Sequence, residues 1–364
     1  MKIKHLAVKN FRNYDIASFT FSDSTNVLIG KNAQGKTNLI EAIYLLSIAK
    51  SFRTRSNEEM IKFNKDFARI LGHVESNNIY RDLEMILFDE GKQAKINGTK
   101  CIKTSEFVGH FNVVVFTPDD LFFVKGSPKN RRRFMDIELS KISSVYLNYL
   151  NSYQHYLKER NQYLKKAALS HKKDDVYLSI ITDQMVDVLI KLANKRYEFI
   201  KKINEIANAI YKKIAGRDEN IEIKYETFFD INDCTKEEVI EFYKKQEERD
   251  YKFAITNYGV HKDDLIVLLN EKPASQFASQ GQQRSIVLAI KIALLEYIHQ
   301  EIGEYPVLLL DDVLSELDVT RQNLLLNLVS RDIQTFITTT SIEGIEHEVI
   351  KKALKIEINQ ERSH

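Results

Sequence analysis

Eight residues near the start of the chain have the types and spacing of a phosphate-binding loop. Residues Gly30 to Thr37 read Gly-Lys-Asn-Ala-Gln-Gly-Lys-Thr and fit the pattern GxxxxGK[ST]. The glycines let successive backbone N–H groups turn towards the phosphates of a nucleotide, and the positive end of the following helix adds to this attraction. Lys36 would reach the β- and γ-phosphates, and the Thr37 hydroxyl would ligate Mg²⁺. The loop therefore predicts a bound nucleoside triphosphate and a magnesium ion.

Two adjacent acids much later in the chain could complete this chemistry. The apolar run from Pro306 to Leu310 ends in Asp311 and Asp312, as expected where a buried strand delivers carboxylates to a phosphate-bound metal ion. Asp311 would hold Mg²⁺ through its water shell, and Asp312 would orient or deprotonate the attacking water. Alone, such a strand end is also compatible with an ordinary turn. Together with the phosphate loop, it predicts nucleotide hydrolysis.

A third motif lies between the first two. The sequence Ser279-Gln280-Gly281-Gln282-Gln283 is followed by a helix that we predict to be amphipathic, with apolar residues from Ile286 to Ile298. Free backbone N–H groups and a hydroxyl at the start of a helix suit a phosphate. An ordinary capped loop would have the same composition.

The elements that must position these residues have an α/β pattern at both ends of the chain. The phosphate loop follows a short apolar run and precedes a helix that continues through Tyr44 to Ser47. Asn97-Gly98 predicts a tight turn between strands. The predicted strands are 2–8, 26–29, 68–74, 82–88, 111–116, 221–225, 265–269 and 307–310.

The middle of the chain has helical periodicity instead. Ser127 and Pro128 predict a helix start, and a charged helix is expected near 235–248. Two heptad seams predict a pair of antiparallel helices packed as a short coiled arm. A parallel stripe of tyrosines could stack on nucleic-acid bases, although its helical spacing favours a core or interface. The first seam comprises Leu147, Leu150, Leu157 and Leu164, the second Met185, Leu189, Leu192, Arg196, Phe199, Ile203, Ile206 and Ile210, and the stripe Tyr146, Tyr149, Tyr153, Tyr156 and Tyr163.

Composition limits the remaining possibilities. The 364 residues are 43% hydrophobic, which allows a large core, and no apolar run approaches a membrane span, so a cytoplasmic protein is expected. Cys101 and Cys234 have neither zinc-site nor disulfide spacing. Residues 125–216 hold 19 Lys and Arg against 9 Asp and Glu, although the whole chain carries only +2. This basic segment, with Arg131 to Arg133, suits either a DNA-binding surface or a solvated helical arm.

The order of the motifs resembles the ATP-binding-cassette (ABC) ATPases, with Walker A at Gly30 to Thr37, a signature at Ser279 to Gln283 and Walker B at Val307 to Asp312. Ser315 to Asp318 resembles the D-loop. A head divided by a helical insertion resembles the SMC-like DNA-repair branch, and further stretches are similar to the RecF family of recombination mediators. Those stretches are 6–14, 50–53, 121–134, 259–264 and 278–284. The resemblance implies an α/β, ABC-type P-loop ATPase head (1–124 and 251–364) with an inserted α-helical arm domain (125–250).

The family resemblance also implies a function. It predicts an ATP-dependent, DNA-binding protein with weak, DNA-stimulated ATPase activity, which dimerises on ATP and acts with RecO and RecR to load RecA at gapped DNA. Double-stranded DNA and single-strand/duplex junctions would be bound at the nucleoid. Ser279, Gly281 and Gln282 of one copy would meet the γ-phosphate held by Lys36 of another. The remaining expected nucleotide contacts are Gly30, Lys31, Asn32, Ala33, Gln34, Gly35, Thr37 and Asn38.

The sequence departs from the ABC pattern in two places, and two other classes of protein were considered. Asp312 stands where glutamate is common, which predicts slow turnover. Thr338 to Ser341 offers no switch histidine, and no Q-loop glutamine is evident near Thr117 to Asp119. An SMC-type DNA-tethering ATPase would need a longer coiled coil than this arm allows. A DNA-cleaving enzyme would need a further acid cluster, for which 261–264 is the available segment.

Overall fold

The chain forms two compact units. The computed structural model describes residues 1–170, 172–215, 219–231, 233–329, 332–341 and 347–359. Unit 1 comprises Met1–Leu121, Ile210–Gly216 and Val287–His364, and unit 2 comprises Phe122–Ala209 and Arg217–Ile286. The segment 251–286, which we assigned to the head from the sequence, thus groups with unit 2.

Unit 1 contains a parallel five-stranded sheet that carries the first two motifs. Two of its strands, Val307–Leu310 and Val113–Phe116, are continuous apolar and buried runs, as parallel strands covered on both faces require, whereas the edge strand Leu354–Glu357 is largely exposed. All neighbours are parallel, so the carboxyl ends of the strands lie at one edge. The strand order is β14 (Leu354–Glu357), β3 (Thr25–Ile29), β13 (Thr335–Thr339), β12 (Val307–Leu310) and β8 (Val113–Phe116).

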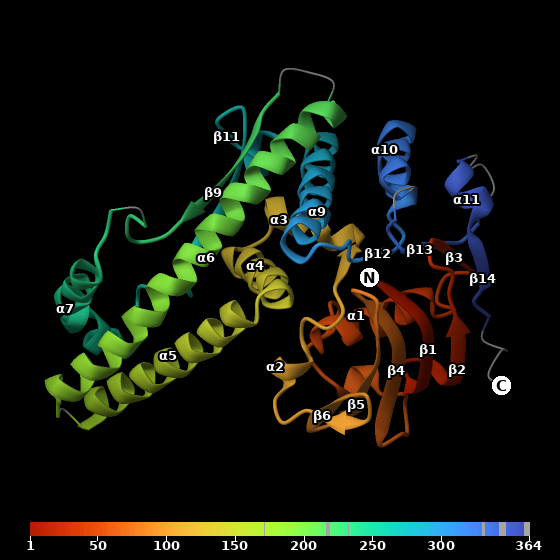
Figure 1. The fold of residues 1–364 in the computed structure, drawn as a ribbon. Helices are drawn as coiled ribbons and strands as arrows, with labels where there is room; N and C mark the ends of the chain where they lie inside the picture. Colours follow the sequence, from red (N-terminus) through yellow and green to blue (C-terminus); the bar gives the residue numbers. More distant parts are fainter. Residues whose placement is uncertain (171, 216–218, 232, 330–331, 342–346, 360–364) are drawn as a thin grey trace. The chain divides into compact units, whose positions relative to one another are not determined.

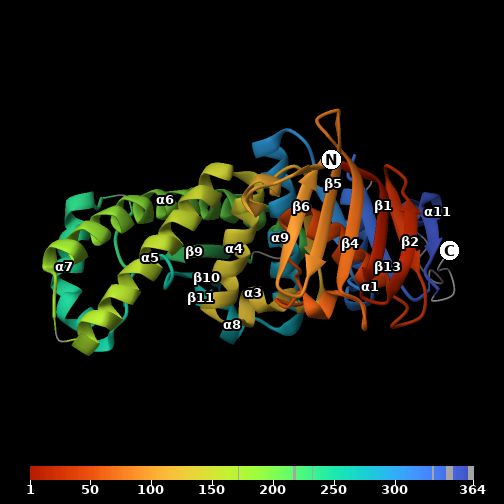
Figure 2. The same cartoon turned by 90° about the horizontal axis from the view of Figure 1, so that it is seen from below.

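A second sheet of unit 1 is antiparallel and six-stranded, and several of its strands lie side by side in Figure 2. Asn97 and Gly98 have φ of 49° and 80°, which confirms the predicted tight turn between the last two strands. The strand order is β2 (Tyr14–Thr20), β1 (Lys2–Phe11), β4 (Phe67–Ser76), β5 (Ile79–Phe88), β6 (Gly91–Ile96) and β7 (Thr99–Lys100).

Helix α1 (Lys36–Ile48), which follows the phosphate loop, contacts both sheets of unit 1. Every residue from Leu39 to Ile48 is buried, because strands cover opposite sides of the helix. Gly72 of β4 permits this close approach, since a Cβ there would lie 2.4 Å from Cδ1 of Leu46. The helix is therefore fixed by packing on all sides.

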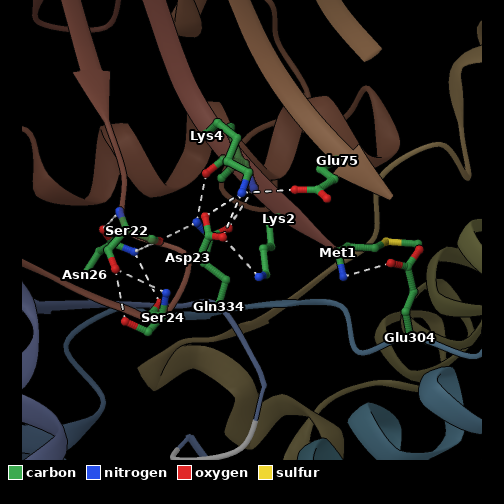
Figure 3. A network of polar contacts seen from close by, with 11 residues as sticks. Met1, Lys2, Lys4, Ser22, Asp23, Ser24, Asn26, Glu75, Glu304 and Gln334 are labelled. Atoms are coloured by element: carbon green, nitrogen blue, oxygen red, sulfur yellow. Dashed lines mark hydrogen bonds and ion pairs between the residues drawn. The ribbon is translucent and has the colours of Figure 1, made fainter. Parts of the chain in front are cut away.

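Polar contacts join the first strand to distant segments of unit 1 (Figure 3). The ammonium groups of Lys2 and Lys4 both bind Asp23. The side chain of Gln334 accepts from the backbone N–H of Ile3 at 2.7 Å and donates to its carbonyl at 2.8 Å. Because Gln334 is fully buried and directly precedes β13, these bonds align the two sheets at the amino ends of the parallel strands, opposite to the edge that carries the phosphate loop and the acids.

Helix α9 (Gln280–Ile302) differs from the amphipathic helix that we predicted. Residues 285–295 are all buried, so α9 is a core helix without a polar face. Its Lys291 pairs with Asp120 at 2.7 Å and donates to the carbonyl of Val115 at 2.6 Å. The other helices of unit 1 are η1 (Glu58–Met60), α2 (Thr104–Phe107), η2 (Pro118–Leu121), η3 (Leu314–Glu316), α10 (Val319–Val329) and α11 (Glu348–Lys352).

Unit 2 is built around two long helices, α5 (Ser144–Ser170) and α6 (Asp175–Ala215), of which the last residues of α6 belong to unit 1. They lie side by side in Figure 1, with α7 (Lys236–Phe253) near one end. Tyr146 of α5 bonds Arg196 of α6, and Arg160 bonds Thr182, so the helices are antiparallel as predicted. The remaining elements are α3 (Phe122–Lys125), α4 (Pro128–Ile142), α8 (Ala274–Phe277) and a sheet of β9 (Ile221–Glu226), β10 (Asp264–Leu269) and β11 (Lys272–Pro273).

The buried face of α5 mixes the two stripes that we distinguished in the sequence. Leu150 and Leu164 are buried, whereas Leu147 and Leu157 are half-buried. Tyr146 and Tyr153 are buried, which favours a core role for these tyrosines over base stacking. No described helix is long and apolar enough to cross a membrane.

Candidate nucleotide-binding site

The phosphate loop joins the carboxyl end of β3 to the start of α1. Ala33 and Gly35 have φ of 64° and 112°, so the chain turns twice through the left-handed region between the two elements. Nζ of Lys36 donates to the carbonyl oxygens of Gly30 at 2.6 Å and Lys31 at 2.9 Å. The lysine is thus folded over its own loop and bonded only to neutral groups there, which phosphate oxygens can replace.

The turn between β1 and β2 supports the phosphate loop from outside. Nδ2 of Asn13 donates to the carbonyl of Gln34, and the Tyr14 hydroxyl donates to that of Gly35, both at 3.0 Å. A Cβ at residue 35 would lie 2.8 Å from Asn13 and 2.9 Å from Tyr14, so both the backbone angle and the space require glycine. Nδ2 of Asn38 also donates to Asn13. Sequence reasoning gave residues 13 and 14 no role, because only the fold brings this turn against the phosphate loop.

Strand β12 brings both acids to the phosphate loop. Oδ1 of Asp311 accepts from the Thr37 hydroxyl at 2.9 Å and from the Thr338 hydroxyl at 3.0 Å. Burial raises the pKa of Asp311, and these two hydrogen bonds oppose the rise. Burial lowers the pKa of Lys36, while the charges of Asp312 and Asp311 oppose that change. The electrostatic coupling places the lysine and both acids in one site.

The donor set fits a magnesium ion. Mg²⁺ prefers hard oxygen ligands at about 2.1 Å in octahedral geometry, so two adjacent ligands lie roughly 3 Å apart. The Thr37 hydroxyl and Oδ1 of Asp311 are 2.9 Å apart. Either atom can therefore bind the ion directly or through water without a large rearrangement of the other.

A buried carboxylate on α1 fixes a pair of arginines beside the site. Glu41 is fully buried and accepts two bonds from Arg12, at 2.7 and 2.8 Å, and one from the Ser51 hydroxyl. Arg53 contacts Glu41 at 3.3 Å and bonds Asn38 at 2.7 Å. This cluster explains why a glutamate is tolerated inside the helix, and sequence spacing gave no signal of it.

The signature motif forms a capped helix start in unit 2. The Ser279 hydroxyl accepts from the backbone N–H of Gln282 at 3.2 Å, and the Gln282 side chain accepts from the N–H of Ser279 at 2.8 Å. Nε2 of Gln282 also donates to Glu219 at 3.1 Å. Gln283 is buried and donates to the carbonyl of Ala278. These bonds hold the motif in a defined shape, as both the capped-loop and the phosphate-binding interpretations predict.

The predicted site residues thus fall in two places. Unit 1 brings together the phosphate loop and both acids, with Thr338 as a contact that we did not foresee. The signature residues Ser279, Gly281 and Gln282 belong to unit 2. The residues in unit 1 are Gly30, Lys31, Asn32, Ala33, Gln34, Gly35, Lys36, Thr37, Asn38, Asp311 and Asp312.

Arg131 and Arg132 of α4 have partners within unit 2. Arg131 binds Asp264 through two nitrogens, at 2.7 and 2.8 Å, and donates to the carbonyl of Gly126. Arg132 donates to the backbone carbonyl of Asp263. The structure favours an intramolecular role for these two side chains over the DNA contact suggested by their charge.

The segment considered for DNA cleavage is also committed to internal contacts. His261 bonds the Tyr153 hydroxyl and the carbonyl of Thr256, and burial lowers its pKa to about 4. Asp263 accepts from the Tyr225 hydroxyl. Within the described part of the chain, no three His, Cys, Asp or Glu side chains are grouped so as to hold a metal ion. The geometry therefore gives no support to a nuclease centre.

Comparison with known proteins shows the family of the chain. Residues 2–363 match the family described as RecF/RecN/SMC N terminal domain. The DNA replication and repair protein RecF of Geobacillus sp. (strain WCH70) is 43% identical over 358 residues, which cover 97% of this chain and 96% of that protein. The chain belongs to the RecF family. The RecF of Bacillus subtilis (strain 168) is 42% identical over 358 residues, covering 97% of each chain.

Solved structures extend the similarity to the fold. A recombination mediator protein RecF with ATP, of the RecFOR pathway, has a TM-score of 0.91 and 33% identity, with 98% of this chain and 95% of that chain covered. The Smc head domain of Pyrococcus furiosus has a TM-score of 0.53 at 15% identity, covering 98% and 93%, which indicates the fold alone. The predicted α/β head of the ABC ATPase type is thus confirmed.

Proposed function

We propose that this protein is an ATP-dependent DNA-binding protein of recombinational repair, in which ATP joins two copies on DNA and slow hydrolysis releases them. The contact of 2.9 Å between Thr37 and Asp311 carries this proposal. The contact joins the phosphate loop to the acid that follows strand β12, although the two segments lie far apart in the sequence. A magnesium-nucleotide site requires this combination of loop and acid. Membership of the RecF family supplies the repair context.

In this proposal each site residue has a distinct task. The loop backbone and Lys36 bind the phosphates. Thr37 and Asp311 hold Mg²⁺, which when bound neutralises charge on the phosphate oxygens. Asp312 orients the attacking water and accepts its proton. Aspartate is one methylene shorter than the glutamate common at this position, so the water is less well placed and turnover is weak.

The signature motif supplies the contact to a second copy. Ser279 and Gln282 are held at the start of α9, and the N-terminal end of a helix is suited to a γ-phosphate. In the proposed dimer, Ser279, Gly281 and Gln282 of one copy meet the nucleotide held by Lys36 of the other. ATP then stabilises the dimer by mass action, and hydrolysis removes that stabilisation.

The proposed setting is the cytoplasm, at the nucleoid. The two heads together would bind duplex DNA and single-strand/duplex junctions, stimulating ATP hydrolysis, and would act with RecO and RecR to load RecA at gaps. The family match and the RecFOR context of the ATP-bound relative support these partners.

The tethering alternative is disfavoured by the length of the arm. Helix α5 has 27 residues, which corresponds to about 40 Å at 1.5 Å per residue. A DNA tether would need a coiled coil several times longer.

DNA binding with ATP, ADP and no nucleotide tests the proposed switch. We expect the wild-type protein to bind a gapped duplex at least ten-fold more tightly with ATP than with ADP, measured by fluorescence anisotropy at fixed salt. Equal affinity in all three states would make the protein a constitutive DNA binder and refute the proposal.

Sedimentation velocity tests the composite site separately. We expect wild-type protein to dimerise with ATP, and Lys36→Arg and Ser279→Ala to remain largely monomeric. Lys245→Arg, which changes an exposed pair with Glu241 in the arm, is the control for substitution itself. Normal ATP-dependent dimerisation of both site variants would show that the signature does not complete the partner's site.

A further inference from the structure

One hydroxyl group connects both acids of the nucleotide site. Thr338 lies near the end of β13 and is 2% exposed. Its Oγ1 donates to Oδ1 of Asp311 at 3.0 Å and accepts from the backbone N–H of Asp312 at 2.8 Å. A hydroxyl is one donor and can accept as well, so Thr338 satisfies a carboxylate and an N–H at once. Valine, which has the same shape, can do neither.

The strand that carries Thr338 has a central place in the parallel sheet. It pairs with β3, which leads into the phosphate loop, and with β12, which ends at the acids. The next residue, Thr339, accepts from the N–H of Gly30 at 3.3 Å through its carbonyl. The end of β13 thus contacts the first residue of the phosphate loop and both acids.

Asp312 needs such support because its backbone is in an unfavourable conformation. Its φ is 55°, a left-handed angle that is unfavourable for residues other than glycine. The bond from its N–H to Thr338 fixes the start of this turn, and Ser315 donates to its carbonyl at 2.8 Å. The direction of the Asp312 carboxylate therefore depends on how well the turn is held.

We propose that Thr338 is a positioning residue of the ATPase reaction: its hydroxyl fixes the metal-binding carboxylate of Asp311 and the turn that aims Asp312 at the attacking water. This inference rests on the proposed function for the roles of the two acids. In this inference, the end of β13 couples the phosphate loop to the catalytic carboxylates. The same segment, 338–341, contains no switch histidine.

Paired substitutions at residue 338 test this role. Loss of a hydrogen bond that orients a metal ligand typically costs 10- to 100-fold in metal affinity or activity. We expect Thr338→Val to lower ATP turnover about 10- to 100-fold and to raise the Mg²⁺ concentration needed for half-maximal ATP binding in calorimetry. Thr338→Ser, which keeps the hydroxyl, should stay within about three-fold of wild type in both measurements. ATP affinity without Mg²⁺ should be unchanged in both variants.

Thr335→Val is the matched control. Thr335 is a fully buried threonine of the same strand, and its hydroxyl donates to the carbonyl of Ile333 at 3.2 Å, away from the acids. The variant should keep the wild-type Mg²⁺ dependence. If Thr338→Val fails to fold, Thr338→Ala replaces it in the comparison with Thr338→Ser.

Three results would overturn the inference: a folded Thr338→Val with wild-type turnover and Mg²⁺ dependence, a Thr338→Ser as impaired as the valine variant, or an equal defect in Thr335→Val. These results are distinct from a failure of the proposed function. If the DNA affinity of the wild-type protein were the same with and without ATP, the proposed ATP control of DNA binding would be refuted. The Mg²⁺ dependence of ATP binding would still decide the role of Thr338.

Discussion

The arm and the nucleotide site both bury charged side chains, but they give them different partners. In the arm, the fully buried Arg160 binds the carboxylate of Asp250 at 2.7 Å. In the nucleotide site, Lys36 binds two backbone carbonyls. A carboxylate cannot leave a buried arginine without a large electrostatic cost, whereas a carbonyl can be exchanged for a charged ligand. The bonding partner of a buried cationic side chain therefore indicates its role: a carboxylate partner indicates that the side chain stabilises the fold, and a carbonyl partner that it is available for a ligand.

A second buried arginine of the arm, Arg196 of α6, is also paired with a carboxylate. Arg196 is 2% exposed and binds Asp136 at 2.8 Å, the Tyr146 hydroxyl at 3.0 Å and the carbonyl of Val260 at 2.7 Å. Its pKa is raised well above the ordinary value despite burial, because the surrounding oxygens favour the charged form. Both arginines thus join helices within unit 2.

The largest effect is expected from breaking the arm pair. Removing one partner of a buried ion pair typically costs about 3–5 kcal/mol, so Arg160→Met should destabilise unit 2 by that amount. Hydrogen exchange of the full chain should show faster exchange in α5, α6 and α7. Lys191→Met, which removes an exposed pair with Asp187, is the control and should cost no more than about 1 kcal/mol. Similar exchange in both variants would remove the distinction between buried and exposed charges.

Substitution of the loop lysine should separate affinity from stability. Lys36→Met removes only bonds to carbonyls that water can replace, so we expect unfolding of unit 1 to change by less than about 1 kcal/mol. ATP turnover should fall roughly 10²- to 10³-fold, as for loss of one charged donor at a transition state. Calorimetric ATP binding and thermal unfolding of the same sample measure both quantities. A large loss of stability would mean that Lys36 also holds the fold.

A smaller effect, which depends on pH, is expected at His261. Its neutral ring accepts from Tyr153 and donates to the Thr256 carbonyl, and burial lowers its pKa from 6.5 to about 4. Between these values the unfolded chain binds the proton and the folded chain does not, so stability is lost as the pH falls from 6.5 to 4. The full loss is about 3 kcal/mol, and His261→Gln should abolish it.

A neighbouring acid makes the comparison with wild type necessary. Burial raises the pKa of Asp263 to about 6, so its contribution changes in the opposite direction, stability falling as the pH rises from 3.8 to 6. The difference in denaturant stability between wild type and His261→Gln, measured from pH 4 to 7, isolates the histidine. A difference that does not vary with pH would contradict the assigned ring state.

The sequence was sufficient to predict those parts of the site whose chemistry is local. The phosphate loop, its helix and the strand before Asp311 were predicted at their places because glycine spacing and apolar runs act over a few residues. The long-range contacts were not predictable in this way. Thr338 reads as one more β-branched strand residue, and only the pairing of β13 with β12 brings its hydroxyl to the acids.

The arm shows the same limit. The heptad spacing placed Arg196 on the buried seam, but nothing in the sequence identified Asp136 as its partner. Arg160 was not foreseen as buried, since a charged residue on a helix is usually solvated. The prediction of an amphipathic α9 was wrong because apolar residues on one face were read without knowledge that neighbouring elements also cover the others.

The order of strands in the parallel sheet has a consequence for synthesis of the protein. Strand β3 has β13 and β14 as its neighbours, and both are synthesised only after Gln334 has been added to the chain. At 5–20 residues per second, the chain from Gly30 to Thr339 takes roughly 15 to 60 s to make. Until then β3 lacks both neighbours and Asp311 lacks Thr338, so a nascent chain cannot assemble the site. The complete site therefore needs a chain that extends past Thr339.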